Sequence, residues 1–255
     1  DVHKYQVDLR IVTHNNKEKW ISDCCVPIKN EETGEVIGSL GILQDVTDRK
    51  RIEKTLKLSF DKLHRVTEGA IDAISKIIEI RDPYTSGHQQ RVAQLACSIA
   101  REMGLGEEKL DAIHMSAVIH DIGKIYVPSE ILSSPRRLTE VEYYILKTHP
   151  EVGYDILKSI EFPWPVAQIV LQHHERINGS GYPAGLAGGD ILLEARIISV
   201  ADVIEAMAYH RPYRPSLTIE SALNEIEENM GVLYDREVAE TCLILFREKG
   251  FKFSS

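Results

Sequence analysis

The sequence His120-Asp121-Ile122-Gly123-Lys124 places an imidazole beside a carboxylate, and a second stretch, HHERINGSGYP at residues 173–183, adds a pair of histidines. Imidazole nitrogens and carboxylate oxygens are ligands for divalent transition metals, and a carboxylate can bridge two cations. Neighbouring residues on a regular helix point about 100° apart, so each pair can converge on a metal only where a helix ends. Gly123 and the Asn178-Gly179 turn supply such ends, and we therefore expect both pairs at helix ends facing one centre.

Further metal-binding residue types recur at regular distances around these two stretches. His88, His120, His149, His173 and Asp202 are separated by 32, 29, 24 and 29 residues, each about one helix plus its return. A helical domain can bring one such turn from each successive helix to a common point. The candidate metal ligands are His88, His120, Asp121, His149, His173, His174 and Asp202.

From residue 81 onward the pattern is helical. Apolar residues recur three and four apart, as at Ile219, Leu223 and Ile226, and no alternating stretch persists. Thr139 and Glu142 fit a helix capping box. The pattern predicts an all-helical domain over residues 81–255.

Residues 1–47 show a different period. Apolar and polar residues alternate from residue 4 to residue 43, with turn signals at Asn15-Asn16 and at Gly34. This pattern predicts a small antiparallel sheet of three strands. The chain is thus expected to be mainly α, with a small amino-terminal β segment and a long connecting helix.

The connecting helix is expected over residues 48–80. Nine positions follow the strict four-three alternation of a coiled-coil seam: Ile52, Leu56, Ser59, Leu63, Val66, Ala70, Ala73, Ile77 and Ile80. The pattern predicts a parallel homodimer formed through this helix. The alternative is that the later seam positions pack on the helical domain of the same chain.

Composition narrows the classes of function. The chain has 255 residues, 43% hydrophobic and 27% charged, as is typical of a soluble protein. Its net charge of -9 argues against binding to a nucleic acid polymer. There is no apolar run long enough to cross a membrane and no signal pattern, and the four cysteines lack CxxC spacing, so we expect a cytoplasmic protein with reduced thiols.

Both histidine-rich stretches resemble the motifs of the HD-GYP family of cyclic dinucleotide phosphodiesterases, from roughly residue 67 to the end of the chain. The resemblance implies two divalent transition metals, Fe or Mn first, with Zn, Ni or Co as alternatives. One metal would take His88, His120, Asp121 and Asp202, and the other Asp121, His149, His173 and His174. Family members with three metals carry a Glu at the position of Tyr84, so a binuclear site is expected. Residues 44–50 resemble the end of a PAS sensor domain, which would make residues 1–47 its C-terminal part.

The resemblance also implies roles toward the substrate. Asp121 and Lys124 would be catalytic, with Lys124 reaching the scissile phosphate. Further substrate contacts would come from Tyr182, Arg211 and Arg214, and more weakly from Asp82 and Glu205. Glu205 stands where the family usually has Asp.

The predicted function is hydrolysis of cyclic di-GMP to pGpG or GMP in bacterial second-messenger signalling. One alternative is hydrolysis of another nucleotide, such as cyclic GMP-AMP, and another is a catalytically quiet cyclic dinucleotide receptor. The Gly181-Tyr182-Pro183 loop favours cyclic dinucleotides over mononucleotides. By family analogy, a diguanylate cyclase is a further partner at this loop.

Overall fold

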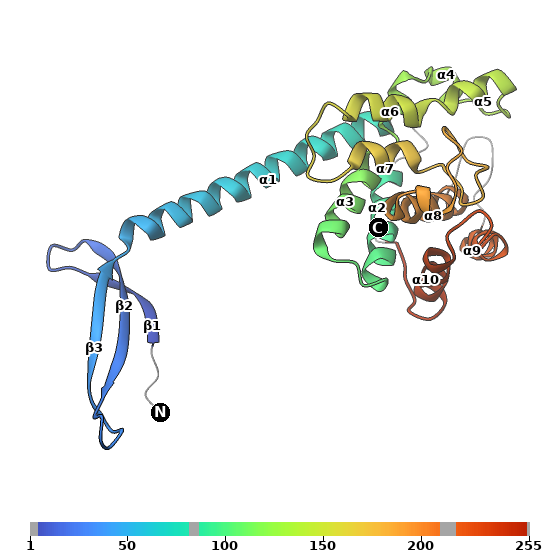
Figure 1. Ribbon diagram of the computed structural model, residues 1–255. Coiled ribbons are helices and arrows are strands. Elements are labelled where there is room, and N and C mark those ends of the chain that lie inside the picture. The colour runs from blue at the N-terminus through green and yellow to red at the C-terminus, as the bar shows by residue number, and fades with distance from the viewer. Residues whose placement is uncertain (1–4, 82–86, 210–217, 254–255) are drawn as a thin grey trace. The chain divides into compact units, whose positions relative to one another are not determined.

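The computed structural model describes residues 5–81, 87–209 and 218–253 (Figure 1). It divides into two compact units, Asp1–Glu68 and Gly69–Ser255, and the division falls inside the long helix α1 (Thr47–Arg81). Among the described residues, no helix combines the length and apolar character needed to cross a lipid bilayer.

The first unit contains the expected three-stranded sheet. Strands β1 (Tyr5–Val12), β2 (Glu18–Lys29) and β3 (Val36–Asp45) are antiparallel, with β2 in the centre. Asn16 and Gly34 take positive φ in the two connecting turns, as their residue types allow. In the described part of this unit only Ser22 and Val46 are buried, so the sheet has a very thin core.

Helix α1 confirms the connecting helix, and it leaves the predicted seam uncovered. All nine seam positions are exposed, including Leu56 at 68% and Leu63 at 67%. Near its end α1 packs on the helical core through Ile71 and Ile78 instead. The later seam positions therefore do not pack on the described residues of the same chain, in contrast to the alternative.

The second unit is all helical in its described residues, as predicted. Its core lies among α2 (His88–Glu102), α3 (Glu107–Ile119), α7 (Val166–Gln172), α8 (Leu193–Ala208), α9 (Ile219–Glu228) and α10 (Arg236–Arg247). Leu95, Ile113 and Ile198 are fully buried there. Burial of such side chains on several helices holds the helix ends that carry the polar site.

A smaller apolar cluster lies beside this core. It joins α4 (Ser129–Leu132), α5 (Glu140–Leu146) and Val127, the residue that follows η2 (Ile122–Tyr126). Its buried members are Val127, Ile131 and Leu132. The capping box of α5 is confirmed, because Thr139 Oγ1 accepts from the Glu142 amide and the Glu142 carboxylate accepts from the Thr139 amide. Figure 1 shows α4 and α5 along one edge of the helical unit, close to α6 (His149–Leu157).

The turn after Asp121 requires a glycine at position 123. A Cβ on Gly123 would lie 1.9 Å from the His149 carbonyl oxygen and 2.7 Å from the Gly153 amide nitrogen. Backbone therefore meets backbone at this point, and η2 lies directly against the start of α6. This close approach places Asp121 beside His149.

We predict that Gly123→Ala lowers the free energy of unfolding by about 3 kcal/mol, because the added methyl group would force two rigid backbone segments apart. Gly69→Ala is the matched control, since a Cβ at Gly69 meets nothing within 4 Å and the residue lies inside a helix. That variant should be neutral or more stable by up to about 1 kcal/mol. Urea unfolding of the three proteins measures both effects, and equal midpoints for Gly123→Ala and the wild type would refute the argument.

Candidate metal centre

The structure brings all seven predicted metal-binding residues together in the helical unit. His88 and His149 begin α2 and α6, His120 and His173 are the C-cap residues of α3 and α7, and Asp202 lies within α8. Asp121 and His174 directly follow the two C-caps. Six of the seven side chains are buried and His174 is half-buried.

Three of the histidines turn Nδ1 toward the carbonyl oxygen three residues earlier. These pairs are His120 with Ala117 (2.7 Å), His149 with Leu146 (2.8 Å) and His173 with Val170 (2.6 Å). A carbonyl oxygen only accepts, so Nδ1 must carry the proton and Nε2 must keep its lone pair. The last carbonyls of a helix lack partners within it. Each helix end thus satisfies a carbonyl and at the same time fixes a metal-binding tautomer.

Glu205 of α8 favours the same tautomer of His88, and a second acid of that helix, Asp202, lies at the other ring nitrogen. The Nδ1 of His88 contacts the Glu205 carboxylate, while its Nε2 lies 3.3 Å from Asp202 Oδ1. The other Glu205 oxygen accepts from Arg91 at 2.6 and 2.8 Å. Glu205 is buried with both oxygens engaged, so the expected contact of Glu205 with substrate does not agree with its position. Asp202 and Glu205 are three residues apart on one helix face, which explains how both can reach one imidazole.

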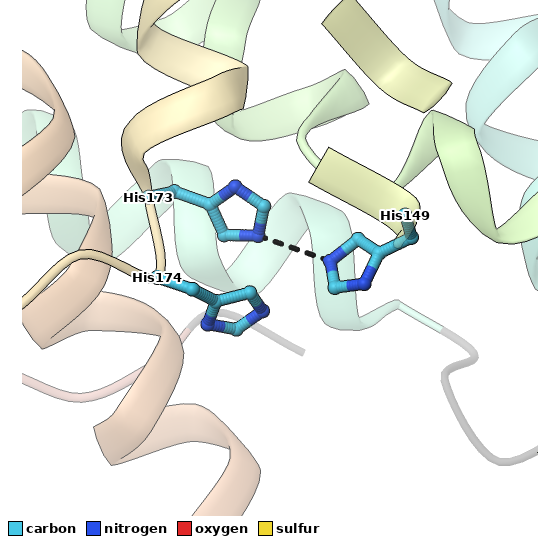
Figure 2. Close-up of side chains that lie close together, drawn as sticks. All are labelled: His149, His173 and His174. Atoms are coloured by element: carbon cyan, nitrogen blue, oxygen red, sulfur yellow. Dashed lines mark hydrogen bonds between the residues drawn. The ribbon is translucent and has the colours of Figure 1, made fainter. Parts of the chain in front are cut away.

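The ligand atoms form three groups that could each hold a metal ion. His120, Asp121 and His173 form one of them, and this group links two others that share no residue. One of these two contains His88, His120 and Asp202, and the other contains His149, His173 and His174. Figure 2 shows the latter group, with His149 Nε2 and His173 Nε2 only 3.3 Å apart. In the described part of the structure, the buried His120 Nε2 has no hydrogen-bond partner. Buried polar nitrogens arranged in this way fit a cation, since leaving them unpaired is costly.

Asp121 lies between the two groups and turns one oxygen toward each. Its Oδ2 is 3.5 Å from His120 Nε2, and its Oδ1 is 3.4 Å from His149 Nε2. Oδ2 also accepts hydrogen bonds from Lys124 Nζ at 2.6 Å and Gln89 Nε2 at 3.2 Å. This placement is what a carboxylate shared by two ions requires.

Burial and charge set the protonation states that metal ligands need. Burial disfavours the charged form of Asp121, but the Lys124 ammonium beside it helps to hold the pKa of this carboxyl well below its usual range. Burial lowers the pKa of His149 to about 4 and lowers the pKa of His120 and His173 as well. At neutral pH the carboxylate is therefore charged and the imidazoles are neutral.

The centre opens into a cavity of about 360 Å³. Lys124 and Tyr182, both predicted to meet the substrate, line it together with Asp121 and Asp202. Asp82, Arg211 and Arg214 lie outside the described residues, as does Tyr84.

The Gly181-Tyr182-Pro183 loop is held by a residue to which the sequence analysis gave no role. Buried Glu175 accepts hydrogen bonds from three successive backbone amides, those of Ala184 (2.8 Å), Gly185 (3.1 Å) and Leu186 (3.0 Å). A Cβ on Gly181 would lie 2.4 Å from the Arg176 amide nitrogen, so only glycine fits there. The loop thereby stacks the ring of Tyr182 on that of His174, with centroids 4.7 Å apart.

Sequence reasoning also missed three other residues at the site. Gln89 contacts Asp121, while Arg176 and Tyr143 line the cavity. Gln89 directly follows His88, and Arg176 follows the His173-His174-Glu175 run. Their places next to predicted metal ligands could have indicated that both residues belong to the site. Tyr143 lies six residues before His149 and had no such signal.

Comparison with protein families places residues 72–238 in a family described as HD domain. Among curated proteins, the chain is 38% identical over 194 residues to the cyclic di-GMP phosphodiesterase response regulator RpfG of Xanthomonas campestris, covering 75% of this chain and 51% of that protein. It is 39% identical over 199 residues to a cyclic di-GMP phosphodiesterase of Thermotoga maritima, covering 77% and 54%. The chain thus spans about half the length of these relatives.

Two further comparisons bear on substrate and fold. A 3'3'-cGAMP-specific phosphodiesterase of Vibrio cholerae is 36% identical over 170 residues, covering 67% of this chain and 37% of that protein. Among solved structures, Bd1817, an HDG"Y"P protein from Bdellovibrio bacteriovorus, matches with a TM-score of 0.56 at 20% identity, covering 71% of this chain and 63% of that one. That structural likeness supports the fold alone.

We predict that the metal-free protein loses stability as the pH falls from 6.5 toward 4. The unfolded chain takes up a proton on His149 below its ordinary pKa of 6.5, whereas the folded chain does so only near pH 4, so acid favours unfolding. One such group changes the free energy of unfolding by about 1.4 kcal/mol per pH unit. Urea unfolding at pH 7 and pH 5 measures the change.

In that experiment, the free energy of unfolding of His149→Gln should depend less on pH than that of the wild type. His114→Gln is the control, because His114 is exposed on α3 and should leave the dependence unchanged. Equal stability of the wild type at both pH values would contradict the assignment of a buried neutral imidazole.

Proposed function

The chain belongs to the HD-domain family, and we propose that it is a metal-dependent phosphodiesterase that hydrolyses cyclic di-GMP to pGpG and/or GMP. The observation that carries this proposal is the pair of ligand groups with Asp121 between them, opening into a cavity lined by Lys124 and Tyr182. The relatives named as cyclic di-GMP phosphodiesterases support the choice of substrate.

The donor set supports two divalent transition metals. His88, His120 and Asp202 would hold one ion, His149, His173 and His174 the other, and Asp121 would contribute to both. Nitrogen and oxygen donors without a thiolate suit Fe or Mn, with Zn, Ni and Co as alternatives. When bound, such a pair activates water as a nucleophile and stabilises charge on the phosphate during in-line displacement.

The protein side chains would position the substrate and balance its charge. Lys124 Nζ, at the cavity wall and 2.6 Å from Asp121, is placed to compensate negative charge that develops on a phosphate oxygen. Arg176 also lines the cavity and offers a planar guanidinium, a geometry that suits phosphate. We assign Arg211 and Arg214 the same class of role from the motif, together with a substrate contact for Asp82.

Two other functions differ from this proposal in substrate or in activity. Hydrolysis of cyclic GMP-AMP is favoured by the relatives in Vibrio cholerae that are named for it. A catalytically quiet receptor would be expected to have lost metal ligands, and all seven are in place here. The cyclic di-GMP activity therefore stands first, as part of bacterial signal transduction, with a diguanylate cyclase at the Gly181-Tyr182-Pro183 loop as a further partner.

We also propose that α1 pairs two copies of the chain. Its seam positions are exposed along their whole length, with Ile52, Leu56 and Leu63 each about two-thirds exposed. A stripe of this length with heptad spacing buries itself best against an identical helix. Residues 1–47, proposed as the C-terminal part of a PAS sensor, would then pass a signal along the paired helices.

We expect protein reconstituted without oxygen with Mn or Fe to convert cyclic di-GMP to pGpG and to hold about two metal ions per chain. Asp121→Asn should lose metal and reduce turnover by at least about 100-fold, because it removes the charge shared by both groups. Asp111→Asn, on the exposed face of α3, is the matched control and should behave as the wild type. Chromatography of the products and metal analysis of the same samples measure these results. A fully metallated wild type without turnover would exclude the proposed activity.

For the dimer, we expect Leu56→Ser with Leu63→Ser to halve the mass in solution, since both substitutions remove apolar contacts of the seam. Leu58→Ser is the control, because Leu58 is 58% exposed but lies off the seam. Sedimentation equilibrium distinguishes the two species. If the double variant keeps the wild-type mass, or if the wild type is already monomeric, α1 does not form the proposed pair.

A further inference from the structure

One wall of the cavity is formed by α5, which contributes none of the metal-binding residues. Tyr143 of α5 lines the cavity, and Lys147 follows directly after the helix. Lys147 Nζ lies 4.7 Å from the ring centroid of Tyr143 and 5.0 Å from that of Tyr182. Because Tyr182 stacks on His174, a continuous row of contacts runs from the metal centre through Tyr182 and Lys147 to Tyr143.

This arrangement differs from an ordinary solvated helix face. Lys147 is half-buried, and among the described residues it forms no ion pair with a carboxylate. Tyr143 is 49% exposed and faces the cavity, whereas its neighbour Tyr144 is 72% exposed and does not line it. A half-buried cation without an acidic partner, beside an open aromatic ring, is a combination that suits an anionic and aromatic ligand.

The chemistry of a cyclic dinucleotide provides such a ligand. It carries two phosphates and two bases in one ring, so when one phosphate lies at the metal centre, the other phosphate and its base must lie farther out. The cavity of about 360 Å³ is near the lower end of the range for ligand pockets, about 300 to 1,000 Å³, which directs the second half of the substrate toward its rim. Tyr143 lines the cavity with Tyr182, and Lys147 Nζ lies close to both rings.

We propose that Tyr143 and Lys147 form a binding site for the half of the cyclic dinucleotide that is not cleaved. A base stacks on the Tyr143 ring, and the second phosphate pairs with the Lys147 ammonium. This inference rests on the proposed function, and it makes α5 the element that distinguishes a cyclic dinucleotide from a small phosphodiester with a single phosphate.

The structure also explains how α5 can hold this position. The capping box fixes the start of the helix, and Arg136 forms an ion pair with Glu142 at 2.7 Å. Ile145 and Leu146 pack on the small cluster around Val127. Leu146 also lines the cavity beside Tyr143, so the packing of α5 on this cluster places Tyr143 at the cavity.

The test compares Tyr143→Ala, Lys147→Gln and the control Tyr144→Ala in the full metal-loaded protein. Two substrates are used: cyclic di-GMP, and methyl p-nitrophenyl phosphate, which has one phosphate and no base. Removal of one stacking platform or one phosphate contact should raise KM for cyclic di-GMP about tenfold while kcat stays close to that of the wild type. Hydrolysis of the small ester and metal content should not change. Calorimetric titration of the metal-free proteins with pGpG, which they cannot hydrolyse, should show a similar loss of affinity.

Each other result would overturn the inference in a different way. If the wild type cleaves only the small ester, the proposed function fails and this inference fails with it. If the wild type cleaves cyclic di-GMP but Tyr143→Ala and Lys147→Gln keep the wild-type KM, only the inference fails. If either variant loses activity on both substrates equally, its residue supports the metal centre rather than the substrate. A matching effect of Tyr144→Ala would show that the whole helix surface, rather than the cavity wall, is responsible.

Discussion

The buried carboxylate of Asp121 is the group on which the rest of the site depends. A charge at this depth is stable only if cations and hydrogen-bond donors surround it. Lys124 and Gln89 donate to one of its oxygens, and imidazoles from three different helices lie within 4 Å. The glycine at position 123 lets the backbone of α6 come close enough to complete this shell. The charge of Asp121, its hydrogen bonds and the close packing of α6 therefore depend on one another.

Much of this arrangement follows from patterns in the chain. The change from period two to period 3.6 predicted a sheet, a long helix and a helical unit, and the structure contains all three. The spacing of His88, His120, His149 and His173 predicted that successive helices would carry these residues to one place, because each interval matches a helix and its return. The requirement that adjacent ligands lie at helix ends was also informative, since His120 and His173 are C-cap residues.

Other parts depend on contacts between segments that no local pattern reveals. Glu205 was expected near the substrate, but its contacts are with His88 and Arg91, more than a hundred residues away in the chain. Glu175 lies in the histidine-rich stretch 173–183, but its hydrogen bonds to three backbone amides depend on how the following loop folds back on it. The position of α5 at the cavity depends on the packing of Ile145 and Leu146 on the small apolar cluster around Val127. Tertiary geometry decides these cases, and residue type alone cannot.

The hydrogen bonds from histidine Nδ1 to helix carbonyls have a consequence for how the protein acquires its metal. These bonds are made within the polypeptide, so the imidazoles are oriented before any ion arrives. In small zinc domains the ligands are disordered until metal binds, and metal binding supplies the energy of folding. Here a large apolar core holds the helices whose ends carry the ligands, so we expect the chain to fold without metal. Folding and metal binding would then be separate events, and exchange with the surroundings rather than the folding reaction would select the ion.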